Sequence, residues 1–230
     1  GQAMLSLGTS GVYFKVTDGF KANPESAVHS FCHALPNTWH LMSVMLSAAS
    51  CLQWFADVIA KQPVEKLLAE LDKEEIDPSN QNGAYFLPYL SGERTPHNNP
   101  EASGSFFGLT HATTQAQLTH AVLEGVSFAF ADALDALHSA AKSNDDDEIT
   151  LIGGGARSAY WRQLLANVLG RKLTFREGGE VGPSLGAARL AQMAIETDRS
   201  VEAICPMPTL VAEHIPNSTA SKNLQARRHT

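Results

Sequence analysis

The sequence predicts an α/β domain in which a mixed sheet is covered by helices. Three observations support this fold class. The first 50 residues contain short strand-like runs separated by turn residues, and from residue 84 onward strand-like and helix-like segments alternate. Glycine-rich turns follow two of the predicted strands. With 230 residues, 43% of them hydrophobic, the chain is long enough to bury a substantial core.

The predicted strands begin with a hairpin. Residues 2–9 and 11–18 are strand-like runs that meet at Ser10 and Gly11. Two further extended runs, residues 29–33 and 39–46, flank the turn residues Pro36 and Asn37. Apolar residues then recur at helical spacing over 47–59 and 64–71, and residues 72–83 are polar and rich in turn formers.

A short strand over residues 84–90 leads into the polar loop 91–100, S-G-E-R-T-P-H-N-N-P. Long loops with Arg, His and Asn often carry function, and a structural salt bridge involving Glu93 and Arg94 is the alternative interpretation. Residues 103–110 predict another turn flanked by glycines.

The longest predicted helix begins at Thr114, where Gln117 completes a capping box. Gly125 interrupts this helix at a cost of about 1 kcal/mol relative to alanine, which indicates a close approach by a neighbour, expected to be another helix. The buried stripe is predicted to consist of Leu118, Val122, Val126, Phe130, Leu134 and Leu137.

The strand that ends at residue 152 is followed by Gly153, Gly154 and Gly155, and then by a helix from Ser158 to Gly170. Three glycines expose bare backbone, against which a nucleotide could lie near a helix N-terminus. The alternative is a tight turn that only lets the helix pack on its sheet. The turn at Gly8, Thr9 and Ser10 offers backbone N–H groups and two hydroxyls that suit a phosphate, although such turns are also common in hairpins without a ligand.

After a strand over 172–176, the turn at 178–183 predicts a helix whose small residues pack closely against the glycine-rich strand end. The prolines and polar residues of 206–230 predict an irregular tail, frayed or cut short. The predicted domain is therefore residues 1–205. The acidic run 145–148 is interpreted as a solvated loop without a function.

The net charge of −7, with scattered basic residues, argues against nucleic acid or an acidic membrane as a partner. Cys32, Cys51 and Cys205 show no spacing typical of zinc sites or disulfide frameworks, which favours a reducing compartment. No apolar run approaches about 18 residues, so we expect a cytoplasmic protein. Because strand-like sequence begins at once, we also expect the chain to be part of a longer protein.

Five segments together resemble the carboxy-terminal half of the FGGY carbohydrate kinases. They are L-S-L-G-T-S-G at 5–11, F-L-P-Y-L-S-G-E-R-T-P-H at 86–97, F-F-G-L-T at 106–110, V-L-E-G-V at 122–126 and L-I-G-G-G-A-R-S-A-Y-W-R-Q at 151–163. The resemblance implies a ribonuclease H-like, actin-type ATPase domain that uses ATP and Mg²⁺. It also implies that Gly8, Thr9 and Ser10 face the phosphates, that Gly104 lies near the nucleotide, and that Gly153, Gly154, Gly155 and Ala156 hold the adenosine, with Arg157 as a further candidate.

The same resemblance implies transfer of the γ-phosphoryl group to the 5-hydroxyl of D-xylulose. Ribulose, glycerol or gluconate are the alternative acceptors, and a non-catalytic actin-like nucleotide-binding module is the alternative outside enzymes. The family supplies its catalytic aspartate and most of its sugar pocket from the amino-terminal half, upstream of Gly1. We therefore expect no catalytic residue and no metal ligand in this chain, no activity of the chain alone, and the amino-terminal half as its partner. A homodimer is compatible with the resemblance.

Overall fold

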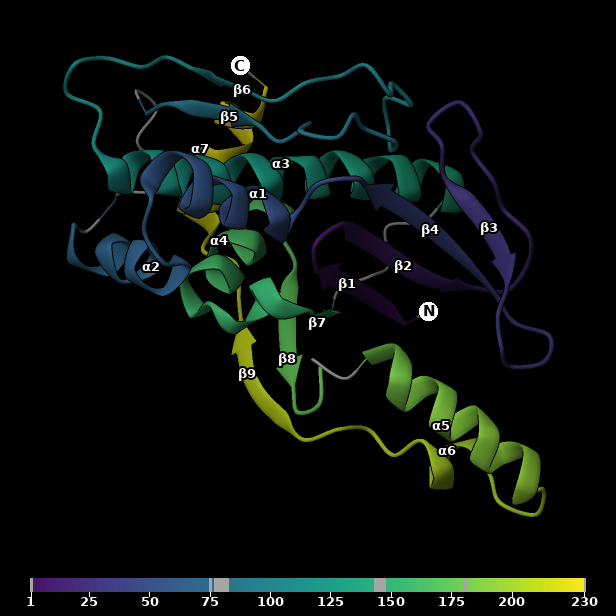
Figure 1. Ribbon diagram of the computed structural model, residues 1–230. Helices are drawn as coiled ribbons and strands as arrows, with labels where there is room; N and C mark the ends of the chain where they lie inside the picture. The colour runs from purple at the N-terminus through teal and green to yellow at the C-terminus, as the bar shows by residue number, and fades with distance from the viewer. Residues whose placement is uncertain (1, 75, 77–82, 143–147, 180–181, 230) are drawn as a thin grey trace.

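A seven-stranded mixed sheet forms the centre of the computed structural model, which describes residues 2–74, 76, 83–142, 148–179 and 182–229 (Figure 1). The strand order is β3-β4-β2-β1-β7-β8-β9, and β5 and β6 form a separate two-stranded sheet. β7 pairs in parallel with both β1 and β8, while the other neighbours are antiparallel. The strands are β1 Ala3–Leu7, β2 Gly11–Thr17, β3 His29–Cys32, β4 Trp39–Met45, β5 Tyr85–Leu87, β6 Ser105–Phe107, β7 Glu148–Ile152, β8 Lys172–Arg176 and β9 Leu210–His214.

Helices α3 and α4 cover one face of this sheet, which confirms the predicted mixed α/β architecture (Figure 1). Along β1, Ala3, Leu5 and Leu7 point into this buried layer, whereas Met4 and Ser6 on the other face are only half-buried. The helices are α1 Ala49–Trp54, which continues as a π-helix over Phe55–Ala60, α2 Val64–Lys73, α3 Gln115–Ala141, a 3-10 turn Gly154–Arg157, α4 Ala159–Leu169, α5 Gly182–Ile195, α6 Val201–Ile204 and α7 Ser218–Arg228.

The predicted capping box starts α3. The Thr114 hydroxyl accepts from the Gln117 N–H at 3.2 Å, and the Gln117 side chain accepts from the Thr114 N–H at 3.0 Å. The expected apolar stripe of α3 is buried, except that Leu118 is half-buried. Local sequence therefore fixes where this helix begins and which face enters the core.

The neighbour of Gly125 is a strand, so the expectation of a helix at this position is wrong. A Cβ atom on Gly125 would lie 2.1 Å from the carbonyl oxygen of Phe86, which belongs to β5. β5 pairs with β6, and β6 lies in the stretch 103–110 that was predicted as a turn only. The missing side chain lets the two-stranded sheet lie directly on α3.

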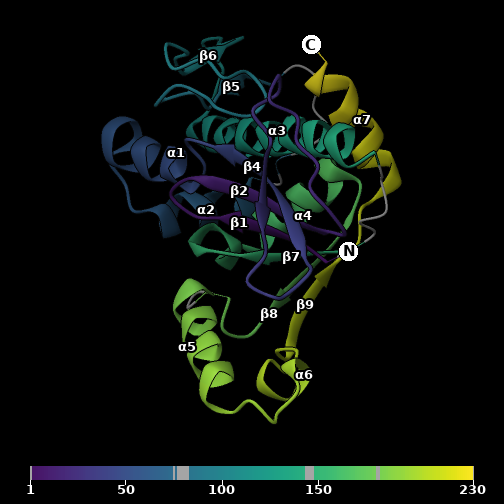
Figure 2. The ribbon, with the colours of Figure 1, turned by 90° about the vertical axis from the view of Figure 1, so that its right-hand side faces the viewer.

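The segment after residue 205 is also more regular than its composition predicts. Leu210–His214 forms β9 at the edge of the main sheet, and Ser218–Arg228 forms α7, which packs beside α4 (Figure 2). The prediction of an irregular tail over 206–230 is therefore wrong, and the sheet extends past residue 205. Leu224 and Arg227 are the buried residues of α7.

Arg227 holds α7 in place through a buried ion pair with Glu124 of α3. Its Nε donates to Glu124 Oε1 at 2.8 Å and its Nη2 donates to Oε2 at 2.7 Å. The two side chains are 2% and 1% exposed. The guanidinium also lies over the ring of Tyr85, 4.2 Å from its centroid. A tail with little apolar surface is thus fixed by charge pairing in the core.

This ion pair predicts a loss of stability in acid. Burial raises the pKa of Glu124, but the bonds from His120 and Arg227 outweigh it and hold the pKa below the ordinary value of 4.5. A lowered pKa contributes stability that is complete above the unfolded-state value and is lost as the pH falls through the folded-state value. We expect the free energy of unfolding, measured with urea, to drop below pH 4.5 more steeply than in a Glu124→Leu, Arg227→Met double variant. If the free energy of unfolding of the two proteins falls in parallel below pH 4.5, Glu124 is not the group that causes the loss of stability.

The prediction for α5 fails in one respect. The helix forms at the expected place, but none of its described residues is buried, and a Cβ on Gly186 would meet nothing within 4 Å. Its small residues therefore do not pack against the strand ends. Figure 2 shows α5 and α6 standing apart from α3, α4 and α7. Of the acidic run 145–148, only Glu148 falls within the described residues.

Candidate functional site

Two glycine turns meet at one edge of the main sheet. β1 and β7 run parallel, with Ser6 opposite Ile152, so both strands end at the same edge. Gly153 has φ +97°, and a Cβ there would lie 2.6 Å from the Leu7 carbonyl oxygen and 3.0 Å from the Gly8 nitrogen. The structure therefore brings the turn 8–10 and the turn 153–155 into backbone contact. In open α/β sheets, ligands bind at the carboxyl ends of strands.

The turn at Gly8, Thr9 and Ser10 is anchored from behind. The carbonyl of Gly8 accepts from the Ala49 N–H at 2.8 Å, and the carbonyl of Thr9 accepts from the Ala48 N–H at 3.0 Å. Both bonds fix the turn to the start of α1. Thr9 and Ser10 are exposed, so their hydroxyls stand at the surface of a fixed turn. This is an arrangement that suits phosphate oxygens.

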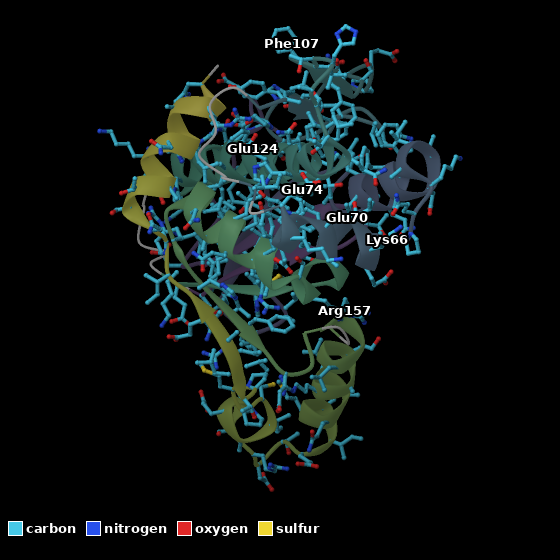
Figure 3. All side chains as sticks on the ribbon, turned by 90° about the vertical axis from the view of Figure 1, so that its left-hand side faces the viewer. Lys66, Glu70, Glu74, Phe107, Glu124 and Arg157 are labelled. Carbon is cyan, nitrogen blue, oxygen red and sulfur yellow. The ribbon has the colours of Figure 1, made fainter. Side chains whose placement is uncertain are left out.

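The residues of the second turn divide into two groups. Gly154 is exposed, and a Cβ on it would meet nothing within 4 Å, so a flat ligand has room to lie on this backbone. Arg157 is also exposed, at the end of the domain body that faces α5 (Figure 3). Gly155 instead packs on Leu7, whose Cγ would lie 2.6 Å from an added Cβ.

The geometry gives no support to the adenosine contact that the resemblance implies for Ala156. Its side chain is completely buried in the core. Its N–H donates to the Gly153 carbonyl at 3.1 Å, and its carbonyl accepts from Arg162 Nη1 at 2.7 Å. Ala156 therefore shapes the turn from inside.

Arg162 is the structural residue that the sequence reasoning missed. Besides Ala156, it contacts the Phe175 ring at 4.6 Å and donates through Nε to His214 Nε2 at 2.9 Å. Burial, and then the charge of Arg162, lower the pKa of His214, so a neutral imidazole accepts this bond. Arg162 thereby ties the glycine turn to α4, β8 and β9. The sequence did not indicate this role for Arg162, because its hydrogen-bond partners lie up to 52 residues away along the chain.

Gly104 is not brought to this edge of the sheet. The atoms nearest to its Cβ position belong to Leu90 at 2.6 Å and Leu87 at 3.1 Å, beside the two-stranded sheet. The geometry gives the predicted contact of Gly104 with the nucleotide no support. Its lack of a side chain is explained by the close approach of these two residues.

The loop 91–100 is tied to the end of β4. Glu93 is buried, and its Oε1 accepts from the backbone N–H groups of Leu46 at 3.0 Å and Arg94 at 2.7 Å. Burial raises the pKa of Glu93 above its usual value, although both backbone bonds act against this. The structural interpretation of this loop thus finds support, but through backbone bonds to Glu93 instead of a salt bridge.

Among the described residues, no group of three or more His, Cys, Asp or Glu side chains is placed to hold a metal ion. Cys32, Cys51 and Cys205 are free thiols. Within the same part of the chain, no helix is both long and apolar enough to cross a membrane.

Residues 3–195 match the model of the FGGY family of carbohydrate kinases, C-terminal domain. The chain is 54% identical over 229 residues to the xylulose kinase of Escherichia coli K12 and 58% identical over 201 residues to that of Klebsiella pneumoniae. These alignments cover 100% and 86% of this chain, but 46% and 40% of the relatives. The chain therefore spans less than half the length of these relatives.

A solved structure also matches this chain over its whole length. The crystal structure of a xylulose kinase from Brucella ovis superposes with a TM-score of 0.90 at 42% identity, covering 100% of this chain and 46% of that one. The match includes the glycine turns and the helices around them, because it extends over the whole chain. The chain belongs to the FGGY family of carbohydrate kinases and corresponds to the C-terminal domain of its members.

Proposed function

We propose that this chain is the ATP-binding half of a kinase that transfers the γ-phosphoryl group of ATP to the 5-hydroxyl of D-xylulose. The contact between the two glycine turns carries the nucleotide part of this proposal, because it sets exposed hydroxyls beside a bare backbone surface. The identity to xylulose kinases supports the choice of sugar. The free cysteines fit a cytoplasmic enzyme.

Each half of the site has a separate task. Thr9 and Ser10 would hold phosphate oxygens, and Gly154 would lie against the adenosine with Arg157 beside it. Mg²⁺, when bound, neutralises charge on the β- and γ-phosphates and lowers the barrier to transfer. The described residues offer no cluster of three or more His, Cys, Asp or Glu side chains for this ion. The proton acceptor for the sugar hydroxyl would come from the amino-terminal half.

Gly154→Val tests the nucleotide surface. Because an added Cβ has open space, the fold is expected to keep its stability, while the new side chain occupies the place of the adenosine. We expect the Kd for ATP of the intact protein, measured by calorimetric titration with Mg²⁺, to rise at least about tenfold, or 1.4 kcal/mol.

Gly19→Val is the matched control, since its Cβ position is equally open and it follows the far end of β2. This variant is expected to bind ATP as the parent does. Equal affinity of the Gly154 and Gly19 variants would remove Gly154 from the site.

The substrate is tested by phosphorylation of D-xylulose, ribulose, glycerol and gluconate by the intact protein, which includes the amino-terminal half. We expect the highest kcat/KM for D-xylulose, and no turnover by the present chain alone because the base and the sugar pocket are absent. A preference for glycerol over xylulose would refute the choice of sugar, and turnover by the chain alone would refute the division of roles.

A further inference from the structure

Glu93 is a buried carboxylate to which the proposed mechanism gives no task. The residue is 2% exposed. Its Oε1 accepts two backbone hydrogen bonds, from Leu46 and Arg94, whereas its Oε2 has no hydrogen-bond partner in the part of the chain that the structure describes. A buried carboxylate with one oxygen unpaired costs free energy that an apolar side chain would not. The presence of a carboxylate at this position therefore needs a reason beyond packing.

The loop 91–100 holds Glu93 against the end of β4. The Glu93 N–H donates to the Asn99 carbonyl at 2.9 Å, and the Glu93 carbonyl accepts from the Asn99 N–H at 2.8 Å. Two residues further on, the Thr95 N–H donates to the Val44 carbonyl at 3.0 Å, and the Thr95 hydroxyl accepts from the Val44 N–H at 3.0 Å. Because these bonds fix the loop at and beyond Glu93, the carboxylate has a defined position relative to β4.

Segment 46–49 links Glu93 to the turn 8–10. At its first residue, the Leu46 N–H donates to Glu93 Oε1 at 3.0 Å. At its other end, the last two N–H groups of the segment donate to carbonyls of the turn, at 3.0 and 2.8 Å. Ser47 between them is 2% exposed, so the middle of the segment is enclosed as well. A shift at Leu46 is therefore transmitted to the turn through a few covalently joined, packed residues.

We propose that Glu93 is a positioning residue for the nucleotide: through segment 46–49, it sets the turn 8–10 in the place where that turn meets the phosphates of ATP. This inference deepens the proposed function and rests on it. A carboxylate suits the task, because one oxygen can accept from two N–H groups of different segments, which an apolar side chain cannot do. Without this acceptor both N–H groups would be left unpaired, and the segment would lose its fixed start.

Binding of ATP and of adenosine to the intact protein separates this role from a general structural one. Glu93→Leu removes the acceptor, so the turn 8–10 should lose its position while the backbone surface at Gly154 is kept. In calorimetric titrations with Mg²⁺ we expect the Kd for ATP to rise at least about tenfold and the Kd for adenosine to stay within about twofold of the parent. An unchanged Kd for ATP overturns the proposal. An equal rise for both ligands also overturns it, because the whole domain would then be disturbed.

The double variant Glu124→Leu, Arg227→Met is the matched control. It removes a carboxylate that is also buried but pairs with a residue of α7. This variant should bind ATP and adenosine as the parent does, and a rise in the Kd for ATP as large as that of Glu93→Leu would overturn the proposal.

If Glu93→Leu does not fold, Glu93→Asp decides the question. The shorter side chain keeps the carboxylate but draws its oxygens back from the Leu46 N–H. We expect its Kd for ATP to rise at least about threefold, with the Kd for adenosine unchanged. A Kd for ATP equal to that of the parent overturns the proposal.

Hydrogen exchange of segment 46–49 distinguishes failure of this inference from failure of the proposed function. Its amide hydrogens should exchange at least about tenfold faster in the Glu93 variants than in the parent, with or without ATP. If the parent binds ATP but the exchange is unchanged, this inference fails while the proposed function stands. If the exchange is faster but the parent binds no ATP, the proposed function fails and the positioning role fails with it, although the link from Glu93 to the turn remains.

Discussion

Arg227→Met is expected to lower the free energy of unfolding of this chain by about 3–5 kcal/mol, because it leaves the carboxylate of Glu124 buried without its main partner. Glu124 is 1% exposed, and its remaining partner, His120 Nε2, lies 3.7 Å from Oε1. The variant also loses the contact with the Tyr85 ring. Urea unfolding followed by circular dichroism at pH 7 measures the change.

Arg199→Met is the matched control, since Arg199 pairs with Glu196 at 2.6 Å but both side chains are exposed. We expect this variant to lose less than about 1 kcal/mol. The double variant Glu124→Leu, Arg227→Met removes both charges and should recover most of the stability lost by Arg227→Met. A loss below 1 kcal/mol for Arg227→Met alone would show that the buried carboxylate of Glu124 does not depend on Arg227 for its stability.

The parts of the fold that sequence could predict are those set by local pattern. Alternation along residues 2–18 predicts the β1–β2 hairpin, because one face of each strand is buried. The capping box at Thr114 predicts the start of α3, and Ser158 and Gly170 predict both ends of α4. Each of these signals operates within a few residues of the feature that it determines.

The errors concern contacts between residues far apart in the sequence. α7 has little apolar surface, and its burial depends on an ion pair that joins residues 103 positions apart. A glycine signals close approach without identifying the neighbour, so the sequence could not show that the neighbour of Gly125 is a strand. The nucleotide contact that the family resemblance implies for residues 153–155 stays a prediction, and the resemblance could not show that the Ala156 side chain faces the core.

Gly153→Ala is expected to destabilise the chain by at least about 2 kcal/mol. At φ +97° an L side chain costs roughly 1–2 kcal/mol, and the new Cβ would lie 2.6 Å from the Leu7 carbonyl oxygen. Since the obstructing atom belongs to the backbone of β1, relief requires separation of β1 from β7, at about 1–3 kcal/mol. Urea unfolding at pH 7 gives the change in free energy.

Gly154→Ala is the control that shows whether the loss of stability is specific to Gly153 or occurs on any substitution in the turn. Its Cβ would meet nothing within 4 Å, and it begins a 3-10 turn, so its free energy of unfolding should stay within about 0.5 kcal/mol of the parent. Two adjacent glycines would then have separate roles: Gly153 joins the two turns, and Gly154 leaves space for the nucleotide. Equal stability of the two variants would mean that the turns do not meet through Gly153, and the proposed nucleotide site would lose its geometric basis.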